Sequence, residues 1–393
     1  MKLVDVSEFF SDFGGGVKTY VHQKLEACAA AGCDATIIAP GPADRRERRR
    51  GGEVIWVRSP TLAFDHRYHL FSNPKPIHDL LDEIQPDILE ASSTWKGAWI
   101  AGRWRGDAAR ALFLHQDPVA VYPHSLFSPR VKEERLDQLC FWFWAYLRRL
   151  AGEFDSLVVA SEWYADRLRR HKIGKPKVIP LGVEKSAFSP QLRNDQLRME
   201  MLRKCDVSDP SAPLFIAVSR HHPEKRLGVV MEGFGRFAAE RPAGLFIIGD
   251  GPAWRTVQRQ AAEYQGVHIA GHIGDRSVVA EHLASADFFV HGGAAETFGL
   301  VVAEALCSGL PFVAPHLGGA ADFAHPAFAE TYRAGDPAAC ADALSRIFSR
   351  NRRELALAAR AGANRISEPG EHVERLIGHY DALIKARRLR LAA

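Results

Sequence analysis

The sequence lacks the marks of secreted, membrane-spanning and metal-dependent proteins. Its six cysteines are scattered with no Cys-x-x-Cys pair, which favours reduced thiols over a disulfide framework or a zinc site. No apolar run approaches the roughly 18 residues of a membrane span. Asp5 and Glu8 interrupt the N-terminal stretch where a secretion signal would be apolar. No two aspartates are separated by a single residue, so a DxD metal motif is absent. We therefore expect a cytoplasmic protein with no metal and no cofactor.

Charge is also nearly balanced, since the formal net charge is only +4. This value is too small to indicate a nucleic-acid partner. One basic cluster stands out, formed by Arg45, Arg46, Arg48, Arg49 and Arg50. A solvated loop is the favoured interpretation of the cluster, ahead of an anionic partner such as a membrane surface.

Short apolar runs, many of them spaced by helix-length segments, fill a chain of 393 residues. This length exceeds the roughly 250–300 residues at which one core stops growing, so two domains are expected. Buried parallel strands in βα units produce this alternation. The predicted fold is α/β, with two Rossmann-like doubly wound domains facing each other across a cleft. Ligands in such sheets lie beyond the carboxyl ends of the strands.

The predicted domain boundary lies where Pro180, Gly182 and Pro190 interrupt the periodicity. We expect an N-terminal domain at 1–182 and a C-terminal domain at 183–370. The last segment, 371–393, has apolar residues at helical spacing, and we expect this helix to pack back on the N-terminal domain.

The segment 291–315 holds two glutamates, Glu296 and Glu304, between two predicted strands. Only residues 298–308 can form a helix there, ended by Gly309 in a left-handed conformation. A helix start with free amides is a ready anion site. The two carboxylates cannot hold phosphate, but they can accept hydrogen bonds from sugar and ribose hydroxyls.

A glycosidase acid/base pair is the competing interpretation of the two glutamates. Eight helical residues rise about 12 Å, whereas paired hydrolase carboxylates lie roughly 5–9.5 Å apart. The position of Glu296 before the helix loosens this comparison, which therefore disfavours a glycosidase without excluding it. An ordinary helix with one N-terminal and one surface glutamate is the remaining alternative.

Residues 296–319, ETFGLVVAEALCSGLPFVAPHLGG, resemble the E-x7-E segment of family 4 glycosyltransferases, a group of retaining, nucleotide-sugar-dependent enzymes with the GT-B fold. Further segments that resemble the family occur in the same order. They are GGGVKTYV at 14–21, His115, SEWYADRL at 161–168, VIPLGVEKSAFSP at 178–190, SRHHPEKRL at 219–227 and GDGP at 249–252.

The resemblance implies roles for individual residues on the donor side. Glu304 is expected to bind the ribose of the donor nucleotide, and Glu296 to contact the donor sugar. The backbone amides of Phe298, Gly299 and Leu300 are expected to meet the sugar and the diphosphate. The C-terminal domain would then bind a nucleotide-sugar donor, and the N-terminal domain the acceptor. At 291–292 this chain departs from the family pattern, with His-Gly in place of Pro-Ser.

Arg220 and Lys225 follow the predicted strand 213–218, and two cations at a strand end suit a diphosphate leaving group. They are expected to take the role that a metal ion has elsewhere. The family also places a functional histidine at the position of His115. Gly15 and Gly16 would let donor diphosphate or acceptor approach the backbone. His221 and His222 are expected to be exposed and receive no role.

The aromatic segment CFWFWAYLRRL at 140–150 has aromatic residues on every side of a helix. This pattern favours a buried helix over an interfacial one.

The predicted function is hexose transfer from a UDP- or GDP-sugar to a hydroxyl of an envelope glycolipid or polysaccharide precursor. A small soluble acceptor and a non-catalytic nucleotide-sugar-binding protein are the alternatives. Peripheral contact with the inner membrane face is a further hypothesis.

Overall fold

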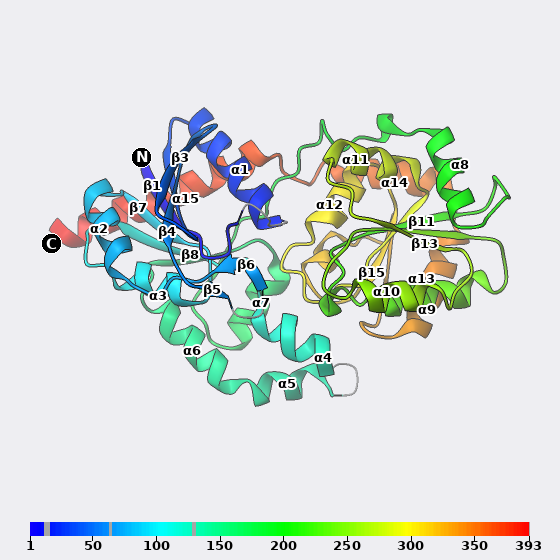
Figure 1. Ribbon diagram of the computed structural model, residues 1–393, viewed down its shortest axis with the longest axis horizontal. Coiled ribbons are helices and arrows are strands. Elements are labelled where there is room, and N and C mark those ends of the chain that lie inside the picture. The colour runs from blue at the N-terminus through cyan, green and yellow to red at the C-terminus, as the bar shows by residue number, and fades with distance from the viewer. Residues whose placement is uncertain (12–15, 63–64, 128–130, 393) are drawn as a thin grey trace. The chain divides into compact units, whose positions relative to one another are not determined.

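A computed structural model describes residues 1–11, 16–62, 65–127 and 131–392. The chain divides into two compact α/β units (Figure 1). Unit 1 comprises Met1–Gln116, Cys140–Gly182 and Pro369–Ala393, and unit 2 comprises Asp117–Leu139 and Val183–Glu368. The predicted α/β class with two parallel sheets is confirmed.

Unit 1 is built on an eight-stranded sheet in the order β10-β9-β8-β7-β1-β2-β4-β3, parallel except for the last pair. Its strands are β1 (Lys2–Val6), β2 (Asp34–Gly41), β3 (Arg45–Arg49), β4 (Gly52–Arg58), β7 (Ile88–Ala91), β8 (Ala109–Phe113), β9 (Ser156–Val159) and β10 (Lys177–Val178), with a separate hairpin of β5 (Thr61–Leu62) and β6 (Asp65–His69). Its helices are α1 (Gly16–Ala30), α2 (Lys75–Ile84), α3 (Lys96–Arg103), α6 (Phe141–Ala151), α7 (Glu162–Arg170) and α15 (Pro369–Ala392).

Unit 2 has a six-stranded parallel sheet in the order β13-β12-β11-β14-β15-β16. Its strands are β11 (Leu214–Val218), β12 (Gly244–Ile248), β13 (Val267–Gly271), β14 (Phe288–Val290), β15 (Phe312–Pro315) and β16 (Ala329–Tyr332). Its helices are η1 (Ala120–His124), α4 (Ser125–Phe127), α5 (Glu133–Leu139), η2 (Pro190–Leu192), α8 (Asp195–Lys204), η3 (Pro223–Lys225), α9 (Leu227–Ala238), α10 (Trp254–Ala261), α11 (Arg276–Ser285), α12 (Leu300–Cys307), η4 (Gly319–Phe323), α13 (Pro337–Phe348) and α14 (Arg352–Ala363).

The segment Asp117–Leu139 belongs to unit 2, although the predicted division at residue 182 assigns it to the N-terminal domain. Its short helix α4 packs against η3 of unit 2. The Arg226 guanidinium also donates a hydrogen bond of 3.1 Å to the carbonyl of His124. The sequence gives no sign of these contacts, because this segment interrupts unit 1 between two elements of one sheet.

The arginine cluster is a strand, not the solvated loop that the sequence favours. Residues Arg45–Arg49 form β3, which pairs antiparallel with β4 at the edge of the sheet. Part of the cluster is paired with carboxylates of unit 1, since Arg46 lies 2.7 Å from Glu83 and Arg49 lies 2.8 Å from Glu47. Charged side chains on an edge strand oppose pairing with another chain, which gives the cluster a structural role.

The aromatic helix α6 is buried on one face only. Phe143, Trp144 and Leu147 are buried, whereas Phe141 and Trp142 are 70% and 62% exposed. The expectation of a helix buried all round is therefore wrong. The number of aromatic residues around a helix does not show which of them neighbouring elements cover.

Candidate donor-binding site in unit 2

The helix predicted between the two strands of this segment is formed and ends at the predicted glycine, although it is slightly shorter than predicted. Helix α12 follows Gly299, whose φ of 87° is left-handed. A Cβ at Gly299 would also lie 3.0 Å from the Cα of Ala320, so this position favours glycine twice over. At the other end Gly309 has a φ of 80°, and its amide and that of Leu310 bond to the carbonyls of Leu306 and Ala305. This is the glycine-terminated helix end that the sequence indicates.

The start of α12 presents free donors. Within the described residues, the amides of Phe298, Gly299 and Leu300 donate no hydrogen bond to the protein. Free amides at a helix start favour an anionic ligand because the helix dipole adds to their charge.

Lys225 and Glu296 form an ion pair although 71 residues separate them in the sequence, with Nζ and Oε1 2.5 Å apart. Lys225 ends η3, which follows β11, and Glu296 lies in the loop after β14. These strands are neighbours in the sheet. The backbones also approach closely, since a Cβ at Gly292 would lie 2.4 Å from the carbonyl of Lys225.

Glu224 links the two predicted cations, and sequence reasoning missed it. Its Oε1 lies 3.5 Å from Arg220 Nη2 and 3.6 Å from Lys225 Nζ. The side chain of Arg220 is 47% exposed, whereas that of Lys225 is 17% exposed. The structure therefore brings Arg220, Lys225 and Glu296 into one ionic cluster at the carboxyl end of the sheet. In the sequence, the place of Glu224 directly before Lys225 was the signal that could have identified it.

The charges in this cluster keep each other ionised. Burial alone would raise the pKa of Glu296, but the positive charge of Lys225 counters it and the pKa is lowered. Burial alone would lower the pKa of Lys225, but the negative charges of Glu296 and Glu224 raise it. At neutral pH the site thus presents a fixed ammonium group beside a fixed carboxylate.

Two histidines near the cluster are buried. His221, expected to be exposed, is fully buried and stacks on Trp254 with ring centroids 5.3 Å apart. His291 is also buried, and its Nε2 lies 3.6 Å from Glu296 Oε1. Burial lowers the pKa of His291 to about 4, so this ring is neutral at neutral pH. The departure from Pro-Ser at 291–292 was the signal that could have identified His291.

Glu304 is buried in α12 and is not a surface glutamate. Its Oε1 accepts a hydrogen bond of 2.6 Å from Arg276, the first residue of α11. Burial raises the pKa of Glu304, while the charge of Arg276 opposes that rise. Arg276 is 49% exposed, and sequence reasoning missed it because it lies outside every family segment.

The remaining predicted residues belong to unit 1. His115 follows β8, and its ring lies 4.1 Å from the Phe113 ring and 4.8 Å from the Tyr20 ring. Burial of this ring lowers the pKa of His115 to about 3. Gly16 is the first residue of α1 and is exposed, whereas Gly15 lies outside the described residues.

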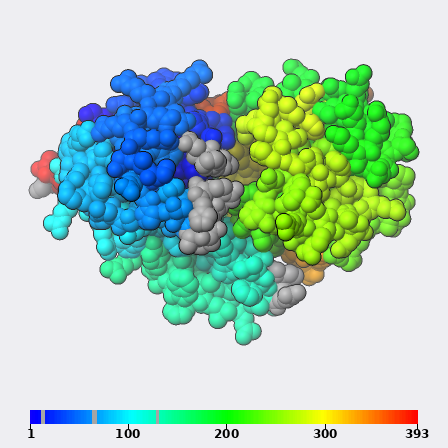
Figure 2. Space-filling view, in the orientation of Figure 1, coloured from blue at the N-terminus to red at the C-terminus, as the bar shows by residue number. Residues whose placement is uncertain are grey.

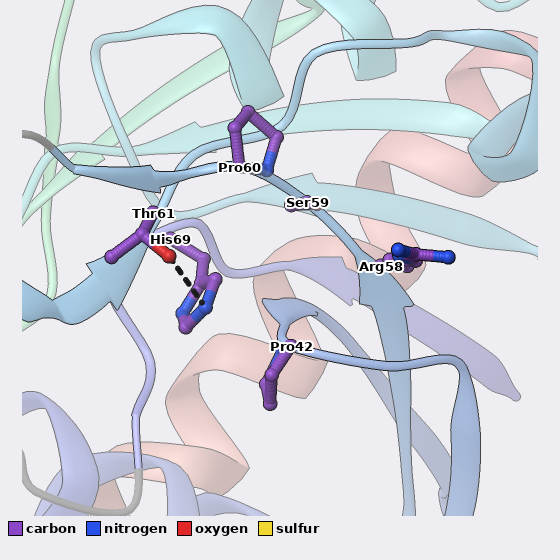
Figure 3. A pocket seen from close by; sticks show the side chains of 6 residues that line it. All are labelled: Pro42, Arg58, Ser59, Pro60, Thr61 and His69. Carbon is purple, nitrogen blue, oxygen red and sulfur yellow. Dashed lines mark hydrogen bonds between the residues drawn. The ribbon is translucent and has the colours of Figure 1, made fainter.

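Unit 1 also contains a pocket of about 460 Å³ at the carboxyl ends of β2 and β4 (Figure 3). Its lining includes Arg58, Ser59, Thr61 and His69, and the last two lie 3.3 Å apart at Oγ1 and Nε2. None of the predicted site residues lines this pocket.

The described residues contain neither a metal-binding cluster nor a helix that could span a membrane. No three side chains of histidine, cysteine, aspartate or glutamate are grouped so as to hold a metal ion there. Among the same residues, no helix combines the length and the apolar character needed to cross a bilayer.

Known proteins resemble the chain over both units. Residues 14–187 match the family described as Glycosyltransferase Family 4, and residues 212–350 match Glycosyl transferases group 1. A GDP-mannose-dependent alpha-mannosyltransferase from Corynebacterium glutamicum is 30% identical over 82% of this chain and 74% of that protein. An equally named protein from Mycolicibacterium smegmatis is 28% identical over the full length of both. A GDP-mannose-dependent alpha-(1-6)-phosphatidylinositol dimannoside mannosyltransferase from Mycobacterium tuberculosis is 26% identical over 80% of this chain and 79% of that protein.

Solved structures share the fold at low sequence identity. Sucrose-phosphate synthase from Thermosynechococcus elongatus superposes with a TM-score of 0.76 at 18% identity, over 98% of this chain and 100% of that chain. Anabaena HepE, solved with UDP and glucose, has a TM-score of 0.71 at 15% identity, over 97% and 99% of the two chains.

Proposed function

The chain belongs to glycosyltransferase family 4, and from this premise we propose that it transfers mannose from GDP-mannose to a hydroxyl of a membrane glycolipid with retention of configuration. That the protein is a GT-B hexosyltransferase follows from the family itself. The donor is inferred from three relatives whose names specify GDP-mannose. The lipid acceptor is inferred from the phosphatidylinositol dimannoside in one of those names.

The ion pair between Lys225 and Glu296 is the structural observation that supports catalysis most directly. Negative charge grows on the diphosphate as the glycosidic bond breaks, and a fixed ammonium group stabilises that charge without reorganising. Arg220, more exposed, would contact the same diphosphate. The carboxylate of Glu296 would accept hydrogen bonds from the sugar hydroxyls. We propose that free amides at Phe298, Gly299 and Leu300 bind the remaining diphosphate and sugar oxygens.

We place the reaction on the cytoplasmic side, with the enzyme in peripheral contact with the membrane. All six cysteines are buried and none forms a disulfide, which suits a reducing compartment. A lipid acceptor requires the enzyme to reach a membrane surface. In unit 1, we propose that His115 lies near the reacting sugar and that Gly15 and Gly16 admit the substrates.

The donor is tested by thermal-shift measurements with GDP, UDP, ADP and their sugars, followed by transfer assays with labelled GDP-mannose and lipid extracts. We expect the largest shift with GDP and GDP-mannose, and a labelled lipid product with an α-linkage by NMR. A shift with UDP alone would overturn the proposed donor. A GDP-mannose shift without transfer to any lipid or soluble acceptor would favour the non-catalytic alternative.

Glu304 should control nucleotide affinity. Replacing Glu304 with Gln should weaken GDP binding about tenfold, because a hydrogen bond to a charged acceptor contributes roughly 1.5–3 kcal/mol. Isothermal titration calorimetry measures this change. Glu263→Gln, an exposed residue of the same unit, is the control and should leave the affinity unchanged. Equal affinities for wild type and Glu304→Gln would remove the ribose role.

Activity should survive chelation of metals. The sequence has no DxD pair, and the proposed cations Arg220 and Lys225 would meet the diphosphate charge themselves. We expect the same initial rate with and without EDTA in the GDP-mannose assay. Complete loss of activity that Mg²⁺ or Mn²⁺ restores would reveal a metal site that involves the substrate.

Trp95 is the best candidate for an acceptor contact in unit 1. It is 37% exposed, whereas Trp104 is buried and donates a hydrogen bond of 2.8 Å to Asp82. Trp95→Ala should raise the acceptor KM several-fold more than the donor KM, because an aromatic face suits a sugar ring. Trp104→Ala, the control, should lower thermal stability instead. Equal effects of Trp95→Ala on both KM values would assign Trp95 to packing.

A further inference from the structure

We infer that one face of α6 docks on an anionic lipid surface. This face, here called the α6 face, consists of Phe141, Trp142, Ala145, Arg148 and Arg149, all of them exposed. These positions recur at the three- and four-residue spacing of a single helix side. The inference deepens the proposed function, on which its biological meaning rests, by naming the surface that would meet the membrane.

The exposed aromatic pair, Phe141 and Trp142, belongs to a helix that its opposite side holds in place. The opposite side of α6 is buried, and there Trp144 stacks on His171 with ring centroids 3.9 Å apart. Phe143 lies 6.5 Å from the Trp95 ring. No other aromatic side chains among the described residues are as exposed as Phe141 and Trp142. In Figures 1 and 2 this segment lies at the lower surface of unit 1. Large apolar side chains held outward at one place mark an interaction surface.

The charge on this face indicates the partner. Helix α6 contains no acidic residue, and Arg148 and Arg149 lie in its last turn. Arg103 of the neighbouring helix α3 adds to them, since Arg103 and Arg149 lie 4.6 and 5.8 Å from the same Trp99 ring. Aromatic residues beside arginines fit the boundary between acyl chains and anionic headgroups.

The arrangement of side chains on the helix fits that boundary as well. An interfacial helix lies in the plane of the surface and buries its apolar side roughly 5–10 Å into the boundary region. With the α6 face turned toward the bilayer, Phe141 and Trp142 enter that region, and the long side chains of Arg148 and Arg149 reach the phosphate groups.

The β3 arginines are a weaker candidate for the same partner. Arg46 and Arg49 are paired with carboxylates of unit 1, as described above, and Trp56 beside them is buried. In Figure 1, β3 and α6 lie at opposite ends of unit 1 in the view, so a flat surface that meets α6 does not meet β3. The two arginine groups therefore provide a matched comparison.

Co-sedimentation of the full chain with vesicles tests the inference. We expect binding to phosphatidylcholine vesicles that contain phosphatidylglycerol, at low salt. Phe141→Ser with Trp142→Ser should lower the partition coefficient about tenfold or more. Arg148→Gln with Arg149→Gln should lower it roughly tenfold at low salt and little at high salt. Arg46→Gln with Arg48→Gln, the control pair in β3, should leave it unchanged.

Depth of insertion is tested by quenching of tryptophan fluorescence with brominated lipids. Trp142→Phe should bind vesicles normally but lose most of the quenching, because the aromatic character stays and the reporting ring is gone. The thermal shift by GDP should be the same in all α6 variants, which separates this surface from the donor site. If the nucleotide shift fails in wild type while vesicle binding persists, the proposed function falls and the docking surface stands.

Two results would overturn the inference. One is vesicle binding that is unchanged in the Phe141→Ser, Trp142→Ser variant. The other is a change of oligomeric state in that variant, measured by light scattering, with no vesicle binding in wild type. The second result would identify the α6 face as a contact between two copies of the chain.

Discussion

Lys225→Ala and Arg220→Ala each lower kcat for mannosyl transfer by about a hundredfold or more. One well-placed charge or donor at a developing negative charge contributes about 3–4 kcal/mol to the transition state, which corresponds to that factor. The donor KM should change much less, because the diphosphate charge grows only as the bond breaks. Steady-state kinetics with GDP-mannose measures both parameters.

The ion pair complicates the interpretation of Lys225→Ala, because the variant also leaves Glu296 without its cation. The double variant Lys225→Ala, Glu296→Gln removes the unpaired carboxylate, so it should recover thermal stability but not activity. Lys204→Ala, an exposed lysine of unit 2, is the control. Arg220 does not contact Glu296 directly, and its replacement should reduce the rate with little change in stability. Rates close to wild type in either single variant would contradict the role of that residue.

The fold was the most predictable property of the chain. The predicted strands of both sheets are present. Strands that helices cover on both faces are largely apolar, so runs such as KLVDV and GLFII indicate them. The helix end at Gly309 followed from backbone chemistry alone. The edge strand β3 was not predictable, because its sequence RRERR, four arginines and a glutamate, has none of the apolar alternation or β-propensity that marks a strand.

The site was predictable only in part, because motifs identify residues that are close in the sequence. Sequence motifs identify residues such as Lys225 and Glu296, and the neighbouring strands β11 and β14 bring them together. The motifs do not identify side chains that arrive from elsewhere, such as Arg276 on α11. Nor do they show burial, and so His221 and the exposed side of α6 were both misjudged.

Lys24→Met should cause the largest loss of stability. Lys24 of α1 lies 3.0 Å from Asp5 of β1 and 2.7 Å from Glu90 of β7, and all three side chains are fully buried. Tyr380 of α15 donates a hydrogen bond of 2.6 Å to Glu90, so this group also ties the C-terminal helix into unit 1. Removing one partner of a buried pair costs about 3–5 kcal/mol, or roughly 10 °C in the melting temperature of a unit of this size.

The pH dependence identifies the cause of that loss. In wild type, burial raises the pKa of Asp5 from 3.8 to about 6 even with Lys24 beside it. A carboxyl group whose pKa is higher in the folded state binds protons more tightly there, so its contribution to stability falls as the pH rises from about 4 through 6. Without Lys24 the pKa of Asp5 rises further, and the pKa of Glu90, which Lys24 holds below its usual value in wild type against the effect of burial, rises as well. The gap between variant and wild type should therefore widen from pH 5 to pH 8.

Calorimetric unfolding across this pH range separates lost charge compensation from lost packing. The triple variant Lys24→Met, Asp5→Asn, Glu90→Gln should recover much of the stability, because no unpaired charge stays buried. Lys175→Met, an exposed lysine of unit 1, is the control and should melt like wild type. A loss in Lys24→Met that is the same at pH 5 and pH 8 would show that Lys24 acts through the packing of its aliphatic chain and not through its charge.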